Sequence, residues 1–211
     1  MKKNMIKAVV FDMGGVIVDL DTDLCLRNFK ELAGFDAIED YLDRFHQKGF
    51  IGELEKGSIT EDDYYARCLS MSRPGTSKET IRDCFCSLLV KLNPDTVALI
   101  KELKGQYDLY ILSNNNSITR AKFSRMMEEA GIPGPETFKK EFYSYEMHLL
   151  KPGREIYDAV IEGIGARPEE ILFIDDSITN VEGAQAAGIK TVWLSPGKDI
   201  REEVFKAIND R

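Results

Sequence analysis

The chain has 211 residues, enough for one domain or for a core domain with a smaller insert. Lys and Arg number 28 against 36 Asp and Glu, and this net charge of -8 argues against a nucleic-acid-binding protein and against a polybasic membrane patch. Hydrophobic residues make up 43 % and charged residues 30 %, a balance that excludes a disordered chain.

Neither the apolar runs nor the cysteines indicate a membrane or secreted protein. The longest apolar runs, such as residues 8–11, are far shorter than the ~20 residues of a membrane span. Residues 1–7 are basic, but the apolar stretch behind them ends at Asp12, so they make a poor secretion signal. The four cysteines lie at no metal-ligand or redox spacing and are expected to be reduced thiols of a cytoplasmic protein: Cys25, Cys68, Cys84 and Cys86.

The first predicted strand is Ile6–Phe11, a continuous apolar run that ends at Asp12. Such runs are typical of strands buried on both faces, as in parallel sheets. About seventy residues follow with helical patterns and no clear strand signal. A helical insert after the first strand is expected to cover the strand ends. We therefore predict a helical cap domain at residues 21–91 and a core domain at residues 1–20 and 92–211.

From residue 92 onward, helix and strand patterns alternate. Asn93-Pro94-Asp95 has the Pro and the acid typical of a first helical turn. The alternation predicts right-handed βαβ units, and hence an α/β fold with a Rossmann-like parallel sheet and helices on both faces. The predicted strands are Asp108–Leu112, Glu141–Tyr145, Ile171–Ile174 and Lys190–Leu194, and the predicted helices after residue 93 cover Ile118–Glu129, Ile156–Ile164, Thr179–Ala187 and Ile200–Ile208.

Polar side chains follow these predicted strands at the point where each strand ends. In open α/β sheets, ligands bind at the carboxyl ends of the strands. Three carboxylates, a hydroxyl, an amide and an ammonium group are therefore expected around one rim. The residues are Asp12, Ser113, Asn114, Lys151, Asp175 and Asp176.

The three acids of this rim cannot all stay ionised without compensation, because close like charges raise one another's pKa. Lys151 supplies one positive charge, and a hard divalent cation such as Mg²⁺, which binds carboxylates and substrate phosphates, would supply the rest. The rim offers no thiolate or imidazole for zinc, and the only histidines of the sequence are His46 and His148. We therefore predict a Mg²⁺ site beside a site for a phosphoryl group.

Four stretches of the sequence resemble, in order, the four motifs of the haloacid dehalogenase-like (HAD) hydrolase superfamily. They are Asp12–Val16, Leu112–Asn114, Lys151–Gly153 and Phe173–Asn180. The predicted insert resembles the cap that one subgroup of this superfamily carries between its first two motifs. Residues 11–18 and 113–116 look most like bacterial phosphatases that act on glucose-1-phosphate.

The resemblance implies a nucleophile and a metal site. Asp12 is expected to attack phosphorus and to form an aspartyl-phosphate that water then hydrolyses. Asp12 and Asp176 are expected to bind Mg²⁺, with Asp175 as a further ligand or as their supporting neighbour. The backbone carbonyl of Gly14 is expected to be another ligand, since the family uses a backbone oxygen at this position.

The resemblance also implies a phosphate site. Ser113 and the backbone of Asn114 are expected to bind phosphate oxygens, and Lys151 is expected to neutralise charge on the nucleophile and on the transferring group. Taken alone, Ser113-Asn114 would more often be a helix cap than a phosphate site, and Asp175-Asp176 could be an ordinary helix cap, which would explain only one of the two acids. Their place after predicted strands favours the site.

The sequence departs from the family pattern at Gly14, where most family phosphatases have a second Asp that protonates the leaving oxygen. Acid–base assistance is typically worth ~10²–10⁴-fold in rate. Three hypotheses follow. The leaving group needs little protonation, as in a sugar-1-phosphate; another group such as Asp19 substitutes; or the chain has kept binding and lost catalysis. We favour the first, because a chain that had lost catalysis would have little reason to keep the whole set of residues.

The sequence thus predicts a Mg²⁺-dependent phosphatase of a small phosphorylated metabolite. The alternatives are a haloacid dehalogenase and a non-catalytic module that binds a phosphoryl ligand or a protein. Dehalogenase chemistry needs no metal and would leave Asp175 and Asp176 without a role. Residues 53–61 of the predicted cap are expected to form a solvated turn and helix start, although cap loops in this superfamily select substrates.

Overall fold

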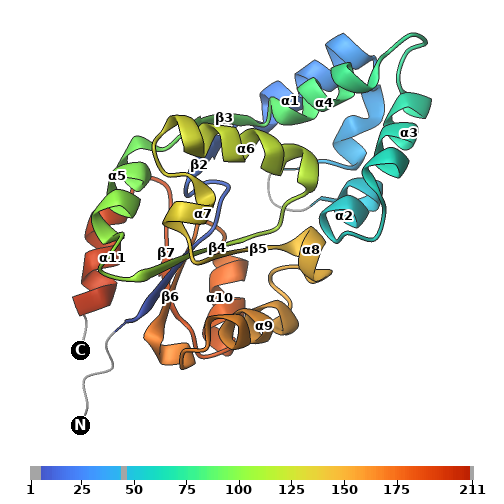
Figure 1. Ribbon diagram of the computed structural model, residues 1–211. Helices are drawn as coiled ribbons and strands as arrows, with labels where there is room; N and C mark the ends of the chain where they lie inside the picture. Colours follow the sequence, from blue (N-terminus) through green and yellow to red (C-terminus); the bar gives the residue numbers. More distant parts are fainter. Residues whose placement is uncertain (1–5, 44–46, 210–211) are drawn as a thin grey trace.

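Five parallel strands form the central sheet of the computed structural model, which describes residues 6–43 and 47–209 (Figure 1). The order across the sheet is β5-β4-β1-β6-β7, so the first strand of the chain lies in the middle. His46 and most of the basic N-terminal stretch lie outside the described residues. The strands are β1 (Ala8–Phe11), β4 (Asp108–Ser113), β5 (Lys140–Tyr143), β6 (Ile171–Asp175) and β7 (Lys190–Trp193).

The predicted α/β fold with a parallel sheet is confirmed, and each predicted strand is present with ends that differ by at most two residues. β1 illustrates why a continuous apolar run predicts a central strand. Val9 and Phe11 belong to the apolar core on one face of the sheet, and Ala8 and Val10 to the core on the other. Neither face of this strand meets water, so every position is apolar.

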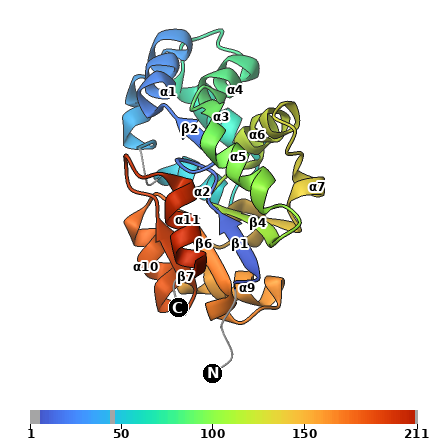
Figure 2. The same cartoon turned by 90° about the vertical axis from the view of Figure 1, so that its left-hand side faces the viewer.

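Helices cover both faces of this sheet, and Figure 2 shows α11 in front of β6 and β7. Residues of α5, α6 and α11 pack on the face of Val9 and Phe11, whereas residues of α9 and α10 pack on the opposite face. Within the described ranges, every helix is too short or too polar to cross a membrane. The helices are α5 (Pro94–Leu103), α6 (Ser117–Glu129), α9 (Arg154–Ile164), α10 (Ile178–Ala186) and α11 (Ile200–Asn209), with two short ones that were not predicted, α7 (Gly134–Thr137) and α8 (Ser144–Met147).

The predicted helical insert has its own apolar cluster at one end of the molecule (Figure 1). Aromatic rings dominate this cluster, and Phe29, Phe85 and Tyr64 lie in successive ring contacts. Ile118 of α6 joins it from the core side. The helices are α1 (Thr22–Asn28), α2 (Gly49–Glu55), α3 (Glu61–Met71) and α4 (Lys78–Cys86), with a π-helical turn at Phe29–Ala33 and a 3₁₀ helix at Asp36–Asp40.

The expectation that the insert contains no strand is wrong at its end. β2 (Val18–Leu20) and β3 (Leu89–Leu92) pair as an antiparallel ribbon through which the chain enters and leaves the insert. β3 escaped prediction because it is buried only at Leu89, while Val90 and Lys91 are exposed. This pattern is neither a continuous apolar run nor a regular alternation.

Candidate active site

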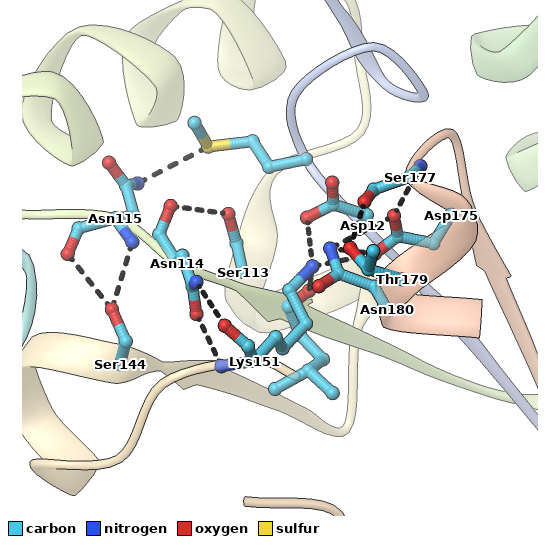
Figure 3. A network of polar contacts seen from close by, with 12 residues as sticks. Asp12, Ser113, Asn114, Asn115, Ser144, Lys151, Asp175, Ser177, Thr179 and Asn180 are labelled. Carbon is cyan, nitrogen blue, oxygen red and sulfur yellow. Dashed lines mark hydrogen bonds and ion pairs between the residues drawn. The ribbon is translucent and has the colours of Figure 1, made fainter. Parts of the chain in front are cut away.

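The carboxyl ends of β1, β4 and β6 surround a small polar cavity. Asp12 follows β1, Ser113 ends β4 and Asp175 ends β6, as the sequence predicts. Figure 3 shows these side chains close together, with Lys151 between the carboxylates. The cavity has a volume of about 120 Å³, and Asp12, Ser113 and Lys151 line it, whereas Asp175 lies behind its wall.

Lys151 joins two of these acids by ion pairs. Its Nζ lies 2.8 Å from Asp12 Oδ1 and 2.7 Å from Asp175 Oδ2, and it donates to the Leu112 carbonyl at 3.2 Å. Burial disfavours the ammonium charge, but the two carboxylates outweigh this effect and hold the pKa of Lys151 above its ordinary value. The lysine therefore stays positively charged.

Asp12 is a buried carboxyl among other charges. Burial is the largest influence and raises its pKa; Lys151 opposes this, while Asp175 and Asp176 add to it. The ionised form that attack requires is therefore disfavoured until more positive charge is present.

Asp175 is fully buried, and several donors surround its carboxylate. Besides Lys151, the Ser177 N–H donates to Oδ1 at 2.8 Å, and the Asn180 amide lies 3.1 Å from both oxygens. These contacts fix Lys151 and the start of α10 against the end of β6. Asp175 thus supports the site from behind.

The carboxylates of Asp12, Asp175 and Asp176 fit a metal ion. One oxygen of each lies within 4.8 Å of the others, and the donors are the hard oxygens that Mg²⁺ prefers. Gly15 is required here, because its φ is +72° and a Cβ would stand 2.2 Å from Asp176 Oδ2. The loop after β1 can therefore lie directly against Asp176.

Asn114 ties the loop after β4 to Lys151. Its Nδ2 donates to the Lys151 carbonyl at 3.0 Å, and its Oδ1 accepts from the Lys151 N–H at 2.9 Å. The side chain is thereby committed to positioning the lysine, and the phosphate role predicted for this residue concerns only its backbone. Ser113 is buried at the cavity wall, with its hydroxyl 3.3 Å from the Asn114 carbonyl.

The two following asparagines have structural roles. Asn116 caps α6, since its Oδ1 accepts from the N–H groups of Ile118 and Thr119 at 3.1 Å. Asn115 donates from Nδ2 to the sulfur of Met13 at 3.3 Å and accepts from the Thr119 hydroxyl. Both nevertheless border the cavity.

The position of the missing family acid is covered by a side chain. A Cβ at Gly14 would stand 2.8 Å from Leu20 Cδ1. Asp19, the substitute suggested from the sequence, lines an outer pocket that adjoins the inner cavity at Leu20 and Asp176, and its Oδ2 lies 3.8 Å from Lys91 Nζ. The structure does not bring Asp19 to the inner cavity.

The helical insert supplies two polar side chains that the sequence patterns did not single out. Gln47 and Glu55 line the inner cavity beside Asp12 and Lys151. Gln47 Oε1 is buried without a hydrogen-bond partner among the described residues. Burial raises the pKa of Glu55 to about 8, with Lys151 opposing and Asp12 adding to the shift. Glu55 lies close to other acids on a short helix, which is the pattern of a solvent-exposed helix face. No signal in the sequence therefore marked it as a site residue.

The turn after Glu55 contacts the core directly. The Ser144 hydroxyl donates to the Glu55 carbonyl at 2.6 Å and accepts from the Asn115 N–H at 3.0 Å. His148 Nδ1 lies 3.2 Å from the Lys56 carbonyl oxygen. Residue 55 is thereby fixed relative to the loop that carries Ser113 and Asn114.

All residues predicted for the site lie around one cavity or directly behind it. Sequence reasoning missed the contribution of the helical insert, whose residues Gln47 and Glu55 line the cavity. The predicted set is Asp12, Gly14, Ser113, Asn114, Lys151, Asp175 and Asp176.

Residues 6–188 match the haloacid dehalogenase-like hydrolase family. The chain is 31 % identical over 206 residues to the D-ribitol-5-phosphate phosphatase of Bacteroides thetaiotaomicron, covering 97 % of this chain and 100 % of the relative. It is 28 % identical over 209 residues to a sesquiterpene phosphatase of Aspergillus oryzae, covering 90 % of each. A variant of a HAD family enzyme from Bacteroides thetaiotaomicron, solved with magnesium and inorganic phosphate, superimposes with a TM-score of 0.88 at 33 % identity over 95 % of this chain and 98 % of that chain. None of these three is named for glucose-1-phosphate, so that finer likeness stays a prediction.

Proposed function

Because the chain belongs to the haloacid dehalogenase-like hydrolase family, we propose that it is a Mg²⁺-dependent phosphatase that hydrolyses a small phosphate monoester through an aspartyl-phosphate on Asp12. One observation carries this proposal. Asp12 Oδ1 lies 2.8 Å from a charged, buried lysine and within a cluster of three carboxylates at the wall of a polar cavity. Such a site combines a nucleophile with a lysine whose charge complements a phosphoryl group, and with carboxylates that can bind the cation.

In the proposed reaction, Asp12 Oδ attacks phosphorus, the Asp12–phosphorus bond forms, and the bond to the leaving oxygen breaks. Lys151 neutralises charge on the nucleophile and on the transferring oxygens, and the Ser113 hydroxyl donates to one of them. Water then attacks phosphorus, which releases inorganic phosphate and regenerates Asp12. The two hydrogen bonds between the Asn114 side chain and the Lys151 backbone keep the lysine next to the loop that carries Ser113.

Asp12, Asp176 and the Gly14 carbonyl are the proposed ligands of Mg²⁺. When bound, the ion supplies positive charge that offsets the acids and the phosphate. The oxygens of Asp175 already accept from Lys151, Ser177 and Asn180, which supports the alternative in which Asp175 positions the site instead of binding the metal.

The proposed cap comprises residues 21–91, and the proposed core comprises residues 1–20 and 92–211. A separate apolar cluster in the insert and its connection through β2 and β3 support this division. Movement of the cap would admit substrate and exclude water during transfer.

We propose a sugar phosphate or polyol phosphate as the substrate, by analogy with the relative named for D-ribitol-5-phosphate. The inner cavity of about 120 Å³ holds a phosphoryl group and a few further atoms. The sugar-1-phosphate predicted from the sequence belongs to the same class. Unpaired thiols at Cys25, Cys68 and Cys84, all buried, support a cytoplasmic location.

Substitution Asp12→Asn tests this function, because it removes the attacking oxygen while keeping the shape of the side chain. Phosphate release should be measured with MgCl₂ on about a hundred phosphorylated metabolites, anomeric and primary-alcohol esters side by side. We expect a fall in kcat of ~10³-fold or more in the variant and a similar loss in wild type after chelation of the metal.

Asp108→Asn is the matched control, since Asp108 is an exposed acid at the opposite end of β4. It should keep wild-type activity. Normal turnover by Asp12→Asn, or chloride release from haloacids without metal in place of phosphate release, would overturn the proposal.

A further inference from the structure

We propose that Glu55 of the cap is the general acid that protonates the leaving oxygen, in place of the acid that the family pattern has at the position of Gly14. This inference rests on the proposed phosphatase function. It concerns a primary-alcohol leaving group, which departs slowly as an alkoxide and therefore needs a proton.

The usual position of the acid is not simply empty. A side chain at Gly14 would meet Leu20, with its Cβ 2.8 Å from Leu20 Cδ1. Leu20, at the end of the ribbon strand that leads into the insert, thus lies against Gly14, which itself offers no acid. The proton donor is therefore sought among the acids that other elements bring to this cavity.

Glu55 is the acid that remains once the others have been assigned. Among the described residues that line the inner cavity, the carboxylates are Asp12, Asp176 and Glu55. Asp12 is the proposed nucleophile and Asp176 a proposed metal ligand. Asp19 lies in the outer pocket, near Lys91.

The backbone of Glu55 is held in place by contacts from the core. The Ser144 hydroxyl donates to the Glu55 carbonyl at 2.6 Å, and His148 contacts the next carbonyl at 3.2 Å. No hydrogen bond or ion pair of the Glu55 carboxyl occurs within residues 6–43 and 47–209. By contrast Glu53, on the same helix, is paired with Arg67 at 2.7 Å.

The direction of attack places the leaving oxygen on the side of the cap. Asp12 approaches phosphorus from the end of β1, and an in-line displacement puts the leaving oxygen on the opposite side of phosphorus. The cap closes that side, and Glu55 is its acid at the cavity. Burial keeps this carboxyl protonated near neutral pH, as a donor requires.

Glu55 gives up one proton and regains one proton in each catalytic cycle. In the first step, the Asp12–phosphorus bond forms, the bond to the leaving oxygen breaks, and the Glu55 proton moves to that oxygen. In the second step, the Glu55 carboxylate takes a proton from the attacking water, the Asp12–phosphorus bond breaks, and Glu55 is again protonated.

Glu55→Gln tests this role with two esters of different leaving group. The first is the primary-alcohol phosphate that wild type hydrolyses best, and the second is 4-nitrophenyl phosphate, whose phenolate leaves without a proton. The quantity to compare is kcat/KM, because it covers the steps up to release of the alcohol. We expect a loss of ~10²–10⁴-fold for the alkyl ester and less than ~10-fold for the aryl ester.

The pH profile supplies a second readout. For the alkyl ester, the decline of wild-type kcat/KM at alkaline pH should disappear in Glu55→Gln, because the proton that is lost there belongs to Glu55. Glu53→Gln, in the same helix, is the matched control and should behave as wild type. Thermal unfolding of both variants checks that they fold.

Equal losses on both esters would show that Glu55 only binds or orients substrate, and unchanged rates would show that it has no role; either result overturns the inference. Failure of the phosphatase proposal is a different outcome, since wild type with Mg²⁺ would then hydrolyse neither ester. If Glu55→Gln does not fold, Glu55→Ala also removes the acid and gives the same comparison between the two esters.

Discussion

The ionised form of the Asp12 carboxyl is unfavourable in this fold until a cation binds beside it. The side chain is buried, and the Lys151 ammonium that faces it is shared with Asp175. With Asp176 nearby, one lysine faces three acids, so the rim repels a phosphate dianion. The cation is therefore expected to bind before the substrate and to prepare the site for it.

The raised pKa of Asp12 predicts how the stability of the metal-free protein depends on pH. The folded state holds this proton more tightly than the unfolded state, so folding takes up a proton and rising pH opposes folding between the ordinary pKa of 3.8 and neutral pH. Asp12→Asn lacks the titrating group. The Tm of the variant minus the Tm of wild type should therefore be larger at pH 8 than at pH 5 by ~3 °C or more. This shift corresponds to ~1 kcal/mol of stability in a domain of this size.

This difference is measured by thermal unfolding in EDTA across that pH range. Asp108→Asn, which alters an exposed acid far from the site, should show no such trend. A constant difference between Asp12→Asn and wild type would contradict the account of the Asp12 environment.

Sequence reasoning predicted the core side of the site, because residues at the ends of adjacent parallel strands must meet at one edge. Asp12, Ser113 and Asp175 lie together for this reason. Glu55 was missed, since its placement depends on where the cap packs and not on the pattern around it. The same holds for the Asn114 side chain, whose partner is the Lys151 backbone, 37 positions away.

The turn at residues 55–57 is the element that joins the cap to the core beside the cavity. Its carbonyl groups accept from Ser144 and contact His148. Gly57 has a φ of +69°, and a Cβ there would stand 2.1 Å from the Tyr145 carbonyl oxygen. Only glycine allows this close approach of two backbones.

Gly57→Ala should weaken this contact and lower kcat/KM by ~10-fold or more, because Glu55 and the cap side of the cavity would shift. Gly75→Ala is a matched control: its φ is +87° and nothing lies within 4 Å of its Cβ. Both variants lose ~1 kcal/mol of stability from the left-handed backbone. Steady-state kinetics and thermal unfolding separate the two effects, and equal kinetics for both variants would contradict the role of the turn.

Among the elements, the long periodic ones were predictable and the short ones were not. α9 and α11 have clear apolar stripes, and β1 and β6 are continuous apolar runs. β2, β3, α7 and α8 have three or four residues each, too few for a period to register. Of these short elements, β2, β3 and α8 connect the insert to the core.

On the scale of the whole molecule, the insert contacts the sheet domain through several elements. The β2–β3 ribbon connects the two covalently, and Ile118 of α6 joins the apolar cluster of the insert. Lys122 Nζ donates to the carbonyls of Cys86 and Leu89, and the turn at residues 55–57 contacts α8. For the proposed cap, the covalent ribbon is the expected pivot and the turn is the expected point of closure.

The position of Trp193 makes its fluorescence a measure of cation binding at the site. Trp193 is the only tryptophan of the sequence, and its indole N–H donates to the Asp176 carbonyl at 3.0 Å in the outer pocket that Leu20 of the ribbon also lines. Titration with MgCl₂ should therefore change the intrinsic emission of the wild type, with no such change in Asp176→Asn. A constant spectrum in wild type would contradict this expectation. A changed spectrum would provide a signal for stopped-flow measurement of cation binding.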